Sequence, residues 1–492
     1  MAKFNETNKN VNKTTNKSGF VAYKMNDKDK LITQVLTSFF NEGKFYGDNS
    51  NELVETATSV CKTEPRFVAN LAVYARKEFH LRSVAHVLTC IVANVVVSKQ
   101  YTRQVMNYVV ERPDDLTEIL ACYINTYGKP IPNSLKKGLA DNLARFNEFQ
   151  ISKYNGGSKA VKFKDILQLT HAKPKNEAQS ELFKKILEDN LATATCWETE
   201  VSAKGNNEET WEALLEKNQL GYMASLRNLR NIINANPKNI NKVYEKLENR
   251  EEVLKSKQLP FRFYSAYKEI SKMPNSTNKP LDVLENALEI SVENIKRIPG
   301  KTAICIDVSG SMGSPISRES SIQCWEIAAL LGAMANKICD EAVIYIFSNS
   351  ASKFPISKHS SILDTVRNMP FIGGGTSIAS PIEQMISDNM QVDRIIILSD
   401  NEANNQFTNT RSSWFGEAYC AEKAAQKYRD KFGQNVWVHA IDLQGYGTQQ
   451  FLGSRTNLIA GWSEKALDFI MLAEEGTTTL AKTIADYMIK ED

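Results

Sequence analysis

Apolar residues recur every three or four positions in one segment after another between about residue 27 and residue 296. This spacing puts them on one face of an α-helix, and such a face has to be buried against another element. Short stretches rich in Pro, Gly, Asn or Asp separate the segments and predict short connections. Many helices joined in this way, without alternating strands, predict antiparallel helix pairs stacked as an α-solenoid. The predicted helices cover residues 29–40, 66–79, 83–110, 115–128, 134–149, 182–192 and 280–295.

The sequence changes its pattern at Lys301. Short apolar runs at residues 302–306, 342–347, 395–398 and 436–441 now alternate with helical stretches such as residues 320–337. Alternating strands and helices predict a parallel, doubly wound sheet that is covered on both faces. The predicted fold class is therefore α plus α/β, with a helical region over residues 19–299 and an α/β domain over residues 300–492.

Residues 1–18 are rich in Asn, Lys and Thr and show no periodicity, so they predict a disordered tail. This segment has neither the apolar core nor the cleavage site of a secretory signal. No apolar run in the chain approaches the roughly 18 residues that cross a bilayer. We therefore expect a cytoplasmic protein that does not enter a membrane.

The eight cysteines are scattered singly, without a CxxC pair or a nearby histidine that would complete a zinc site. We expect them to be buried thiols, because a free cysteine commonly packs as a small apolar residue.

A carboxylate and two hydroxyls follow the first apolar run of the α/β domain. The run TAICID ends at Asp307, and Ser309 and Ser311 follow it in the turn VSGSM. Open parallel sheets bind ligands at the carboxyl ends of their strands. Gly310 and Gly313 permit unusual backbone angles, so the three oxygens can converge on one point.

Two further segments offer oxygens in the same order along the chain. FIGGGTS places Thr376 on a glycine loop, and RIIILSDNE places Asp400 just after another apolar strand. Hard oxygen ligands select Mg²⁺, Mn²⁺ or Ca²⁺ over zinc. We therefore predict a divalent metal site, with Mg²⁺ as the expected ion and with remaining positions open to water or to an acidic group of a partner. Its predicted ligands are Asp307, Ser309, Ser311, Thr376 and Asp400.

Two alternatives compete with the metal site. A plain Ser/Gly turn would account for DVSGS alone, whereas three such segments in order are far more specific. A phosphoryl-transfer enzyme with an aspartate nucleophile would place a second aspartate where Ser309 stands, and a hydroxyl is a poor general acid near neutral pH. A GxxxxGK[ST] phosphate loop is absent, and none of the five histidines lies near a GxSxG turn. We therefore expect no enzymatic activity.

Both parts of the chain resemble known families. The α/β domain resembles a von Willebrand factor A (vWA) domain with a DxSxS metal site, on the strength of DVSGS, GGGTS and RIIILSDNE. The helical region resembles the TROVE module of the Ro ribonucleoprotein (Ro autoantigen) family, in its bacterial form. The matching stretches lie between about Gly19 and Tyr267 and include GFVAYKMNDKDKL, PNSLKKGLADNLARF, FKDILQLTHAKPK, TCWETEVSAKG, GYMASLRNLRNI and LPFRFYSAY.

The resemblance implies a fold and a function. HEAT-like helices would close into a monomeric ring, with the vWA domain helping to close it. Such a protein would bind small noncoding Y RNAs on the outer surface and the single-stranded 3′ ends of misfolded RNAs in the central hole. It would act in RNA quality control, and bacterial members are associated with exoribonucleases such as polynucleotide phosphorylase.

The charge distribution is compatible with RNA binding by the helical region. Residues 301–492 carry a net charge of −6, and the first 300 residues carry +9. The densest basic stretch contains only three acidic residues, and such a stretch can neutralise phosphates. His171 within it could stack on a base or contact phosphate, and the resemblance makes it the best single candidate. The basic residues of this stretch are Lys136, Lys137, Arg145, Lys153, Lys159, Lys162, Lys164, Lys173 and Lys175.

A second candidate RNA-binding segment is MASLRNLRN. Arg227 and Arg230 are three residues apart and are therefore predicted to share a helix face. They either contact RNA or pair with glutamates of neighbouring repeats. The aromatic residues Phe261, Phe263 and Tyr264 could stack on bases, but we expect them to pack between repeats.

The leading hypothesis is thus a non-enzymatic protein that binds Y-like RNA and structured RNAs with free 3′ ends. The alternative is a metal-dependent protein-interaction scaffold, in which the vWA-like face grips an acidic partner and RNA binding is incidental.

Overall fold

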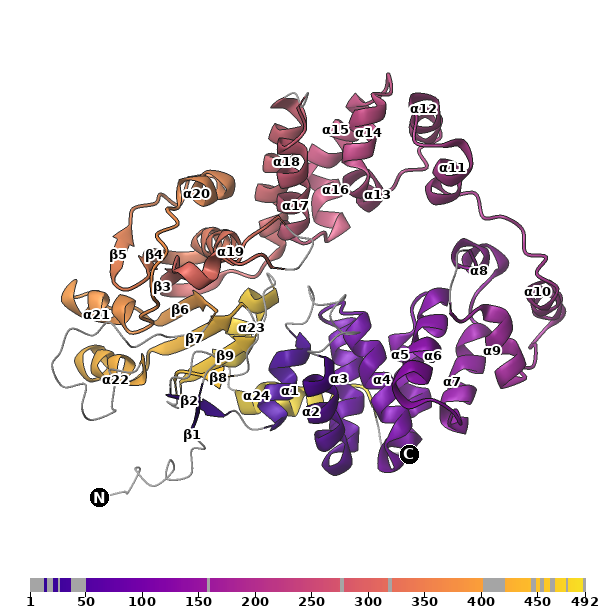
Figure 1. Ribbon diagram of the computed structural model, residues 1–492, viewed down its shortest axis with the longest axis horizontal. Coiled ribbons are helices and arrows are strands. Elements are labelled where there is room, and N and C mark those ends of the chain that lie inside the picture. Colours follow the sequence, from indigo (N-terminus) through magenta and orange to yellow (C-terminus); the bar gives the residue numbers. More distant parts are fainter. Residues whose placement is uncertain are drawn as a thin grey trace. The chain divides into compact units, whose positions relative to one another are not determined.

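The computed structural model describes most of the chain and divides it into two compact units. The helical unit comprises Asp27–Gln219 and Thr478–Asp492, and the mixed unit comprises Met1–Asn26 and Leu220–Thr477. Figure 1 labels their helices and strands. The described residues are 13–15, 21–24, 27–36, 50–156, 160–274, 278–316, 321–400, 421–443, 448–451, 455–460, 465–474 and 477–489.

The helical unit is a stack of short helices. Helix α3 contacts α4 and α5, α4 contacts α6, α5 contacts α7, and α7 contacts α9. Contacts between every second helix are what stacked helix pairs produce, so the predicted solenoid is confirmed. Its helices are α1 (Asp27–Leu36), α2 (Ser50–Thr63), α3 (Pro65–Lys77), α4 (Ser83–Asn94), α5 (Thr102–Val109), α6 (Pro113–Tyr127), α7 (Asn133–Leu143), α8 (Glu148–Tyr154), α9 (Phe163–Thr170), α10 (Glu177–Leu187), α11 (Trp197–Lys204) and α12 (Glu208–Glu216).

Asparagine side chains begin several of these short helices. Asn147, Asn176 and Asn207 precede α8, α10 and α12, and each side chain accepts a hydrogen bond from a backbone N–H of the first turn. Proline at the first helical position serves α3 and α6 at Pro65 and Pro113, where the missing N–H has no helical partner to lose. The local sequence therefore fixes where these helices begin.

Residues 83–110, predicted as one helix, form three pieces. Helix α4 ends at Asn94, the 3₁₀-helix η2 (Val96–Tyr101) follows, and α5 begins at Thr102. Val95 has extended backbone angles, and the buried Ser98 hydroxyl donates to the carbonyl oxygen of Val92 at 2.8 Å. The prediction of one long helix was therefore wrong. It was made because the apolar spacing continues across this break. Residues 134–149 are divided in the same way between α7 and α8.

The end of the chain belongs to the helical unit. Helix α24 (Thr477–Ala485) leads to a segment whose backbone bonds to the fully buried Asn70 of α3. The Asn70 amide donates to the carbonyl oxygen of Ala485 at 2.7 Å, and its oxygen accepts from the N–H groups of Met488 and Ile489 at 3.0 and 2.8 Å. Residues 478–489 thus complete the helical unit rather than the α/β domain in which they were predicted.

The mixed unit combines a second group of helices with a six-stranded sheet. The sheet has the order β5-β4-β3-β6-β7-β9, and every neighbouring pair is parallel except the edge pair β4–β5. The predicted doubly wound α/β domain is therefore confirmed, with one antiparallel edge strand. The strands are β3 (Ile298–Asp307), β4 (Cys339–Phe347), β5 (Ala351–Phe354), β6 (Arg394–Ser399), β7 (Trp437–Asp442) and β9 (Thr456–Ala460).

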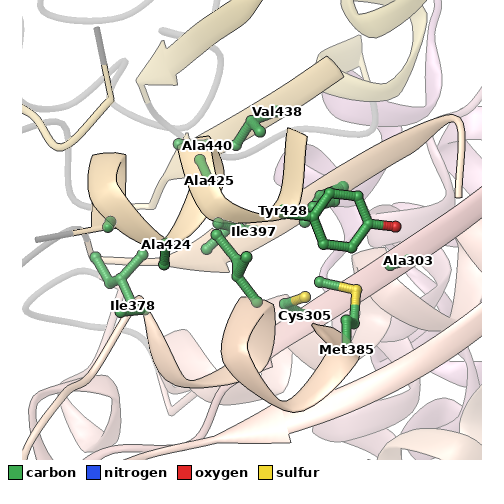
Figure 2. Close-up of a cluster of buried hydrophobic side chains, with 14 of the residues drawn as sticks. Ala303, Cys305, Ile378, Met385, Ile397, Ala424, Ala425, Tyr428, Val438 and Ala440 are labelled. Atoms are coloured by element: carbon green, nitrogen blue, oxygen red, sulfur yellow. The ribbon is translucent and has the colours of Figure 1, made fainter. Parts of the chain in front are cut away.

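Helices cover both faces of this sheet. Helices α21 (Ser380–Ser387) and α22 (Ala421–Phe432) pack over Cys305, Ile397 and Val438, as Figure 2 shows. The other face carries α19 (Cys324–Ile338) and α23 (Lys465–Glu474). The remaining helices of the unit are α13 (Tyr222–Arg227), α14 (Leu229–Ala235), α15 (Asn241–Glu248), α16 (Arg250–Ser256), α17 (Pro260–Ser271), α18 (Asn278–Ser291) and α20 (Ile362–Asn368), with the 3₁₀-helices η3 (Val292–Asn294) and η4 (Gly310–Gly313).

A small sheet joins the beginning of the chain to the α/β domain. Strands β1 (Lys13–Thr15), β2 (Val21–Lys24) and β8 (Thr448–Gln449) pair antiparallel in the order β1-β2-β8. Strand β1 lies inside residues 1–18, which the sequence predicted to be disordered; the other residues of that predicted tail lie outside the described residues.

The predicted buried thiols are confirmed at six cysteines, while Cys196 is half-buried and Cys420 lies outside the described residues. Within the described ranges, no single helix is both long and apolar enough to cross a bilayer. Helix α4 and the segment Val96–Val109 pass that test of length and composition only as a pair bent by 116°.

Candidate metal centre and RNA-binding surfaces

The predicted metal ligands meet at the carboxyl edge of the six-stranded sheet. Strands β3 and β6 are neighbours with Ile306 opposite Leu398, so Asp307 and the segment Ser399–Asp400 reach the same edge of the sheet. The Thr376 hydroxyl donates to Ser309 Oγ at 2.9 Å, and Ser309 Oγ lies 3.4 Å from Ser311 Oγ. The three segments that the sequence singled out thus form one cluster of oxygen atoms, which we call the metal edge: Asp307, Ser309, Ser311, Thr376 and Asp400.

Backbone contacts between two glycine-rich loops hold the metal edge together. The N–H of Gly310 donates to the carbonyl oxygen of Gly374 at 3.0 Å, and the N–H of Gly373 donates to that of Val308 at 2.9 Å. A side chain on Gly310 would meet the Gly374 oxygen at 3.1 Å, and Gly374 has a φ of +84°. Glycine is needed at these two positions for close approach and for a left-handed backbone.

The two carboxylates of the metal edge are buried and repel each other. Asp307 is fully buried and Asp400 is 2% exposed. Burial, and then the neighbouring Asp400 carboxylate, raise the pKa of Asp307 to about 7, although hydrogen bonds from Ser309 and Ser399 lower it. A divalent cation between the carboxylates would remove this repulsion, so the donor set fits a hard cation bound by carboxylates and hydroxyls.

One residue that contacts the metal edge was missed from the sequence. The Ser399 hydroxyl donates to Asp307 Oδ2 at 2.5 Å and is 2% exposed, so it fixes the orientation of that carboxylate. Ser399 stands directly before Asp400, and the pairing of two parallel strands was the signal that could have found it. Ser311 is the one predicted ligand with an exposed side chain. Within the described ranges, no group of three or more His, Cys, Asp or Glu residues could hold a metal ion.

The basic stretch of the helical unit divides into residues with and without intramolecular partners. Lys153 lies 3.7 Å from Glu198, and Lys164 lies 2.9 Å from Asp189. Arg145 donates to the carbonyl oxygens of Asn107 and Val110 at 3.1 and 3.3 Å, and thereby holds the C-terminal end of α5. Arg145, predicted as an RNA ligand, therefore has a structural role in the fold. Lys159 lies outside the described residues.

Four of the predicted RNA ligands remain available on α7 and just after α9. Lys136 and Lys137 lie on α7, half-buried and exposed respectively, and within the described residues neither pairs with a carboxylate. His171 ends α9 in the left-handed conformation, with a φ of 50°, and both it and Lys173 are exposed. Helices α7 and α9 contact each other. We call Lys136, Lys137, His171 and Lys173 the basic face.

Arg227 and Arg230 were predicted to share one helix face, but they lie on two separate short helices. Helix α13 ends at Arg227 and α14 begins at Leu229, because the buried Asn228 leaves helical geometry and its amide donates to the carbonyl oxygen of Ala224 at 2.9 Å. Both arginines are exposed and nevertheless line one groove. The Arg230 guanidinium lies 3.5 Å from the Glu269 carboxylate, which agrees with the predicted pairing between helices. The aromatic residues of α17, Phe261, Phe263 and Tyr264, are buried, as expected for packing.

The fold and the metal edge define a helical solenoid protein that carries a vWA-type domain. The TROVE domain family profile matches residues 14–193 and 189–309, and the profile of the Ro60 vWA domain matches residues 301–436. The chain therefore belongs to the TROVE-domain family, as a protein of the Ro type.

Two relatives and one solved structure place this chain among known proteins. Telomerase protein component 1 is 21% identical over 306 residues in Mus musculus and 22% identical over 328 residues in Rattus norvegicus. These alignments cover 45% and 49% of this chain but only 12% of each relative. The crystal structure of the Deinococcus radiodurans RO (RSR) protein matches 93% of this chain and 99% of its own, with a TM-score of 0.66 and 14% identity, and so shares the fold.

Proposed function

We propose that this protein binds small noncoding, Y-like RNA and the single-stranded 3′ ends of misfolded RNAs, and that it does so without catalysing a reaction. Family membership over residues 14–309 supports RNA binding. The observation that carries the proposal within this chain is the basic face, because its lysines have no carboxylate partner among the described residues. Closure of the helices into a monomeric ring, a cytoplasmic location and a partner exoribonuclease such as polynucleotide phosphorylase belong to the same proposal.

The basic face suits the RNA backbone more than a specific sequence. Lysines neutralise phosphates and release counterions, which gives affinity that depends on salt. His171 projects from the end of α9 and can stack on an unpaired base or donate to a phosphate. RNA recognition by shape and by unpaired nucleotides follows from this chemistry.

The test reverses the charge of the basic face. A variant with Lys136→Glu, Lys137→Glu, Lys173→Glu and His171→Ala is expected to lose most of its affinity for a structured RNA with a free 3′ end, measured by filter binding at physiological salt. The matched control reverses three exposed lysines elsewhere, Lys62, Lys238 and Lys242, and is expected to bind as the wild type does. Unchanged binding by the basic-face variant would show that RNA is bound elsewhere.

A second candidate function is a metal-dependent protein-interaction scaffold. It is favoured by the metal edge, which has the donors for Mg²⁺, and by Phe371 and Ile372, which are 44% and 55% exposed on the neighbouring loop. A partner could complete the metal coordination with an acidic group. Purification from cells separates the two functions: partners that survive nuclease treatment but are lost in Asp307→Ala would favour the scaffold.

A further inference from the structure

A groove on the mixed unit carries three arginines on its walls. It lies between the short helices α13 and α14 on one side and helix α17 on the other, and its volume is about 550 Å³. Arg227 and Arg230 line one wall, and Arg262 of α17 lines the other. All three side chains are exposed. The sequence singled out the first two but not Arg262, because their meeting depends on how α17 packs on α13 and α14.

The floor of the groove is apolar. Leu226, Leu229 and Ile270 line it and are buried to 6%, 1% and 1% exposure. Met223 at the rim is 50% exposed, which leaves its thioether accessible to a ligand. The groove therefore pairs an apolar surface with cationic walls.

One carboxylate lines the groove among the described residues, and it is shared. Glu269 lies 3.5 Å from Arg230 and also accepts a hydrogen bond from Lys272 at 2.9 Å. The Arg230 and Glu269 side chains are 58% and 46% exposed, and ion pairs this exposed contribute little to stability. Because Lys272 can keep Glu269 neutralised, Arg230 can turn to a phosphate at little cost.

We infer that this groove binds one unstacked nucleotide of an RNA strand, with its flanking phosphates on the arginines and its base against the apolar floor. The inference rests on the proposed RNA-binding function and adds a second site to the basic face. A volume of about 550 Å³ falls within the size of small-ligand sites, which suits a nucleotide. Guanidinium groups form bidentate hydrogen bonds with phosphate and stack on bases, so arginine serves both parts of the ligand. A duplex keeps its bases paired and stacked and cannot place one in the groove.

The experiment measures the affinity of the full chain for four ligands. They are a short oligouridine, a blunt RNA duplex without unpaired ends, uridine monophosphate and polyglutamate. The groove variant is Arg227→Gln, Arg230→Gln and Arg262→Gln. The control variant removes three exposed arginines that pair with carboxylates elsewhere, Arg103→Gln, Arg250→Gln and Arg297→Gln. Thermal unfolding of each variant checks that it folds.

We expect the groove variant to bind oligouridine at least about tenfold more weakly, with a salt slope shallower by about 1. Its affinity for the blunt duplex should equal that of the wild type, and the control variant should bind both RNAs normally. The single variant Arg262→Lys keeps the charge but not the planar group, and it should retain only part of the wild-type affinity for oligouridine.

Three outcomes would overturn the inference, and they differ from failure of the proposed function. Oligouridine binding equal in wild type and groove variant would place the single-strand site elsewhere while RNA binding stands. Uridine monophosphate that binds as tightly as the oligomer would make the groove a site for free nucleotides. Polyglutamate that binds more tightly than RNA, and only with the arginines intact, would make it a site for acidic proteins. If the wild type binds neither RNA, the proposed function itself fails.

Discussion

At the scale of single residues, Asp307 is the central residue of the metal edge in the α/β domain. A fully buried carboxylate beside a second buried carboxylate is unfavourable unless hydrogen bonds or a cation compensate. Ser309 and Ser399 supply two hydrogen bonds, from a backbone N–H at 2.9 Å and a hydroxyl at 2.5 Å. A cation would supply the rest.

Mg²⁺ should therefore raise the melting temperature of the full chain. A ligand at a hundred times its Kd stabilises a fold by ~2.7 kcal/mol. Asp307→Ala should abolish the shift, and Ser311→Ala, which removes an exposed hydroxyl and leaves the core intact, should reduce it. The exposed Ser352→Ala is the control. Equal Mg²⁺ shifts in wild type and Asp307→Ala, measured by calorimetry, would rule out the metal edge.

A buried cluster of ionisable side chains, on the sheet face that carries α23, makes the stability of the mixed unit depend on pH. Glu474 accepts from Arg394 at 2.5 and 2.9 Å and lies 3.1 Å from His439 Nε2. Burial opposes ionisation of Glu474, but the hydrogen bonds from His439 and Arg394 lower its pKa from 4.5 to about 2. Burial also lowers the pKa of His439 below its ordinary value, against the opposing hydrogen bond with Glu474.

Acid should destabilise the mixed unit through this group. The stabilisation by Glu474 is present above pH 4.5 and is lost as the pH falls toward about 2, and it amounts to ~3 kcal/mol. His439 acts in the same direction as the pH falls below its ordinary 6.5, because its lowered pKa means that the unfolded chain takes up that proton at a higher pH than the folded chain does. Glu474→Gln should flatten the pH dependence of urea unfolding below pH 4.5. A variant with the wild-type pH profile would contradict this.

At the scale of elements, contacts between distant segments decide what the local pattern leaves open. The apolar runs predicted β3, β4, β6 and β7, because a buried parallel strand is apolar throughout. The breaks at Val95 and Asn228 were not predictable, because the apolar spacing runs through both and packing sets the backbone there. The position of the metal edge was predictable because the carboxyl ends of parallel strands lie at the same edge of a sheet, whatever the order of the strands.

Asn70 shows what the sequence could not reveal. It stands inside the apolar pattern of α3, and its three hydrogen bonds go to the backbone of residues 485–489 at the other end of the chain. Asn70→Ala should leave these groups without partners and cost ~1–3 kcal/mol. We expect faster hydrogen exchange at residues 485–489 in this variant and no change in the control Asn241→Ala, an exposed asparagine. Unchanged exchange in Asn70→Ala would mean that α24 alone holds the segment.

At the scale of the whole molecule, the proposed RNA-binding surfaces and the metal edge lie in parts of the chain that differ in the sign of their net charge. The basic face and the arginine groove both lie in the first 300 residues, which carry +9, and the metal edge lies in residues 301–492, which carry −6. We therefore expect an RNA polyanion to be attracted to the helices rather than to the α/β domain. The metal edge remains available to a separate partner.

The salt dependence of RNA affinity tests the central claim most directly. The logarithm of the binding constant of the full chain for a structured RNA with a single-stranded 3′ end, plotted against the logarithm of salt concentration, should fall along a straight line. The basic-face variant should give a weaker affinity and a shallower slope, and the three-lysine control should reproduce the wild-type line. A wild-type affinity that does not change with salt, or a basic-face variant on the wild-type line, would contradict RNA binding by this face.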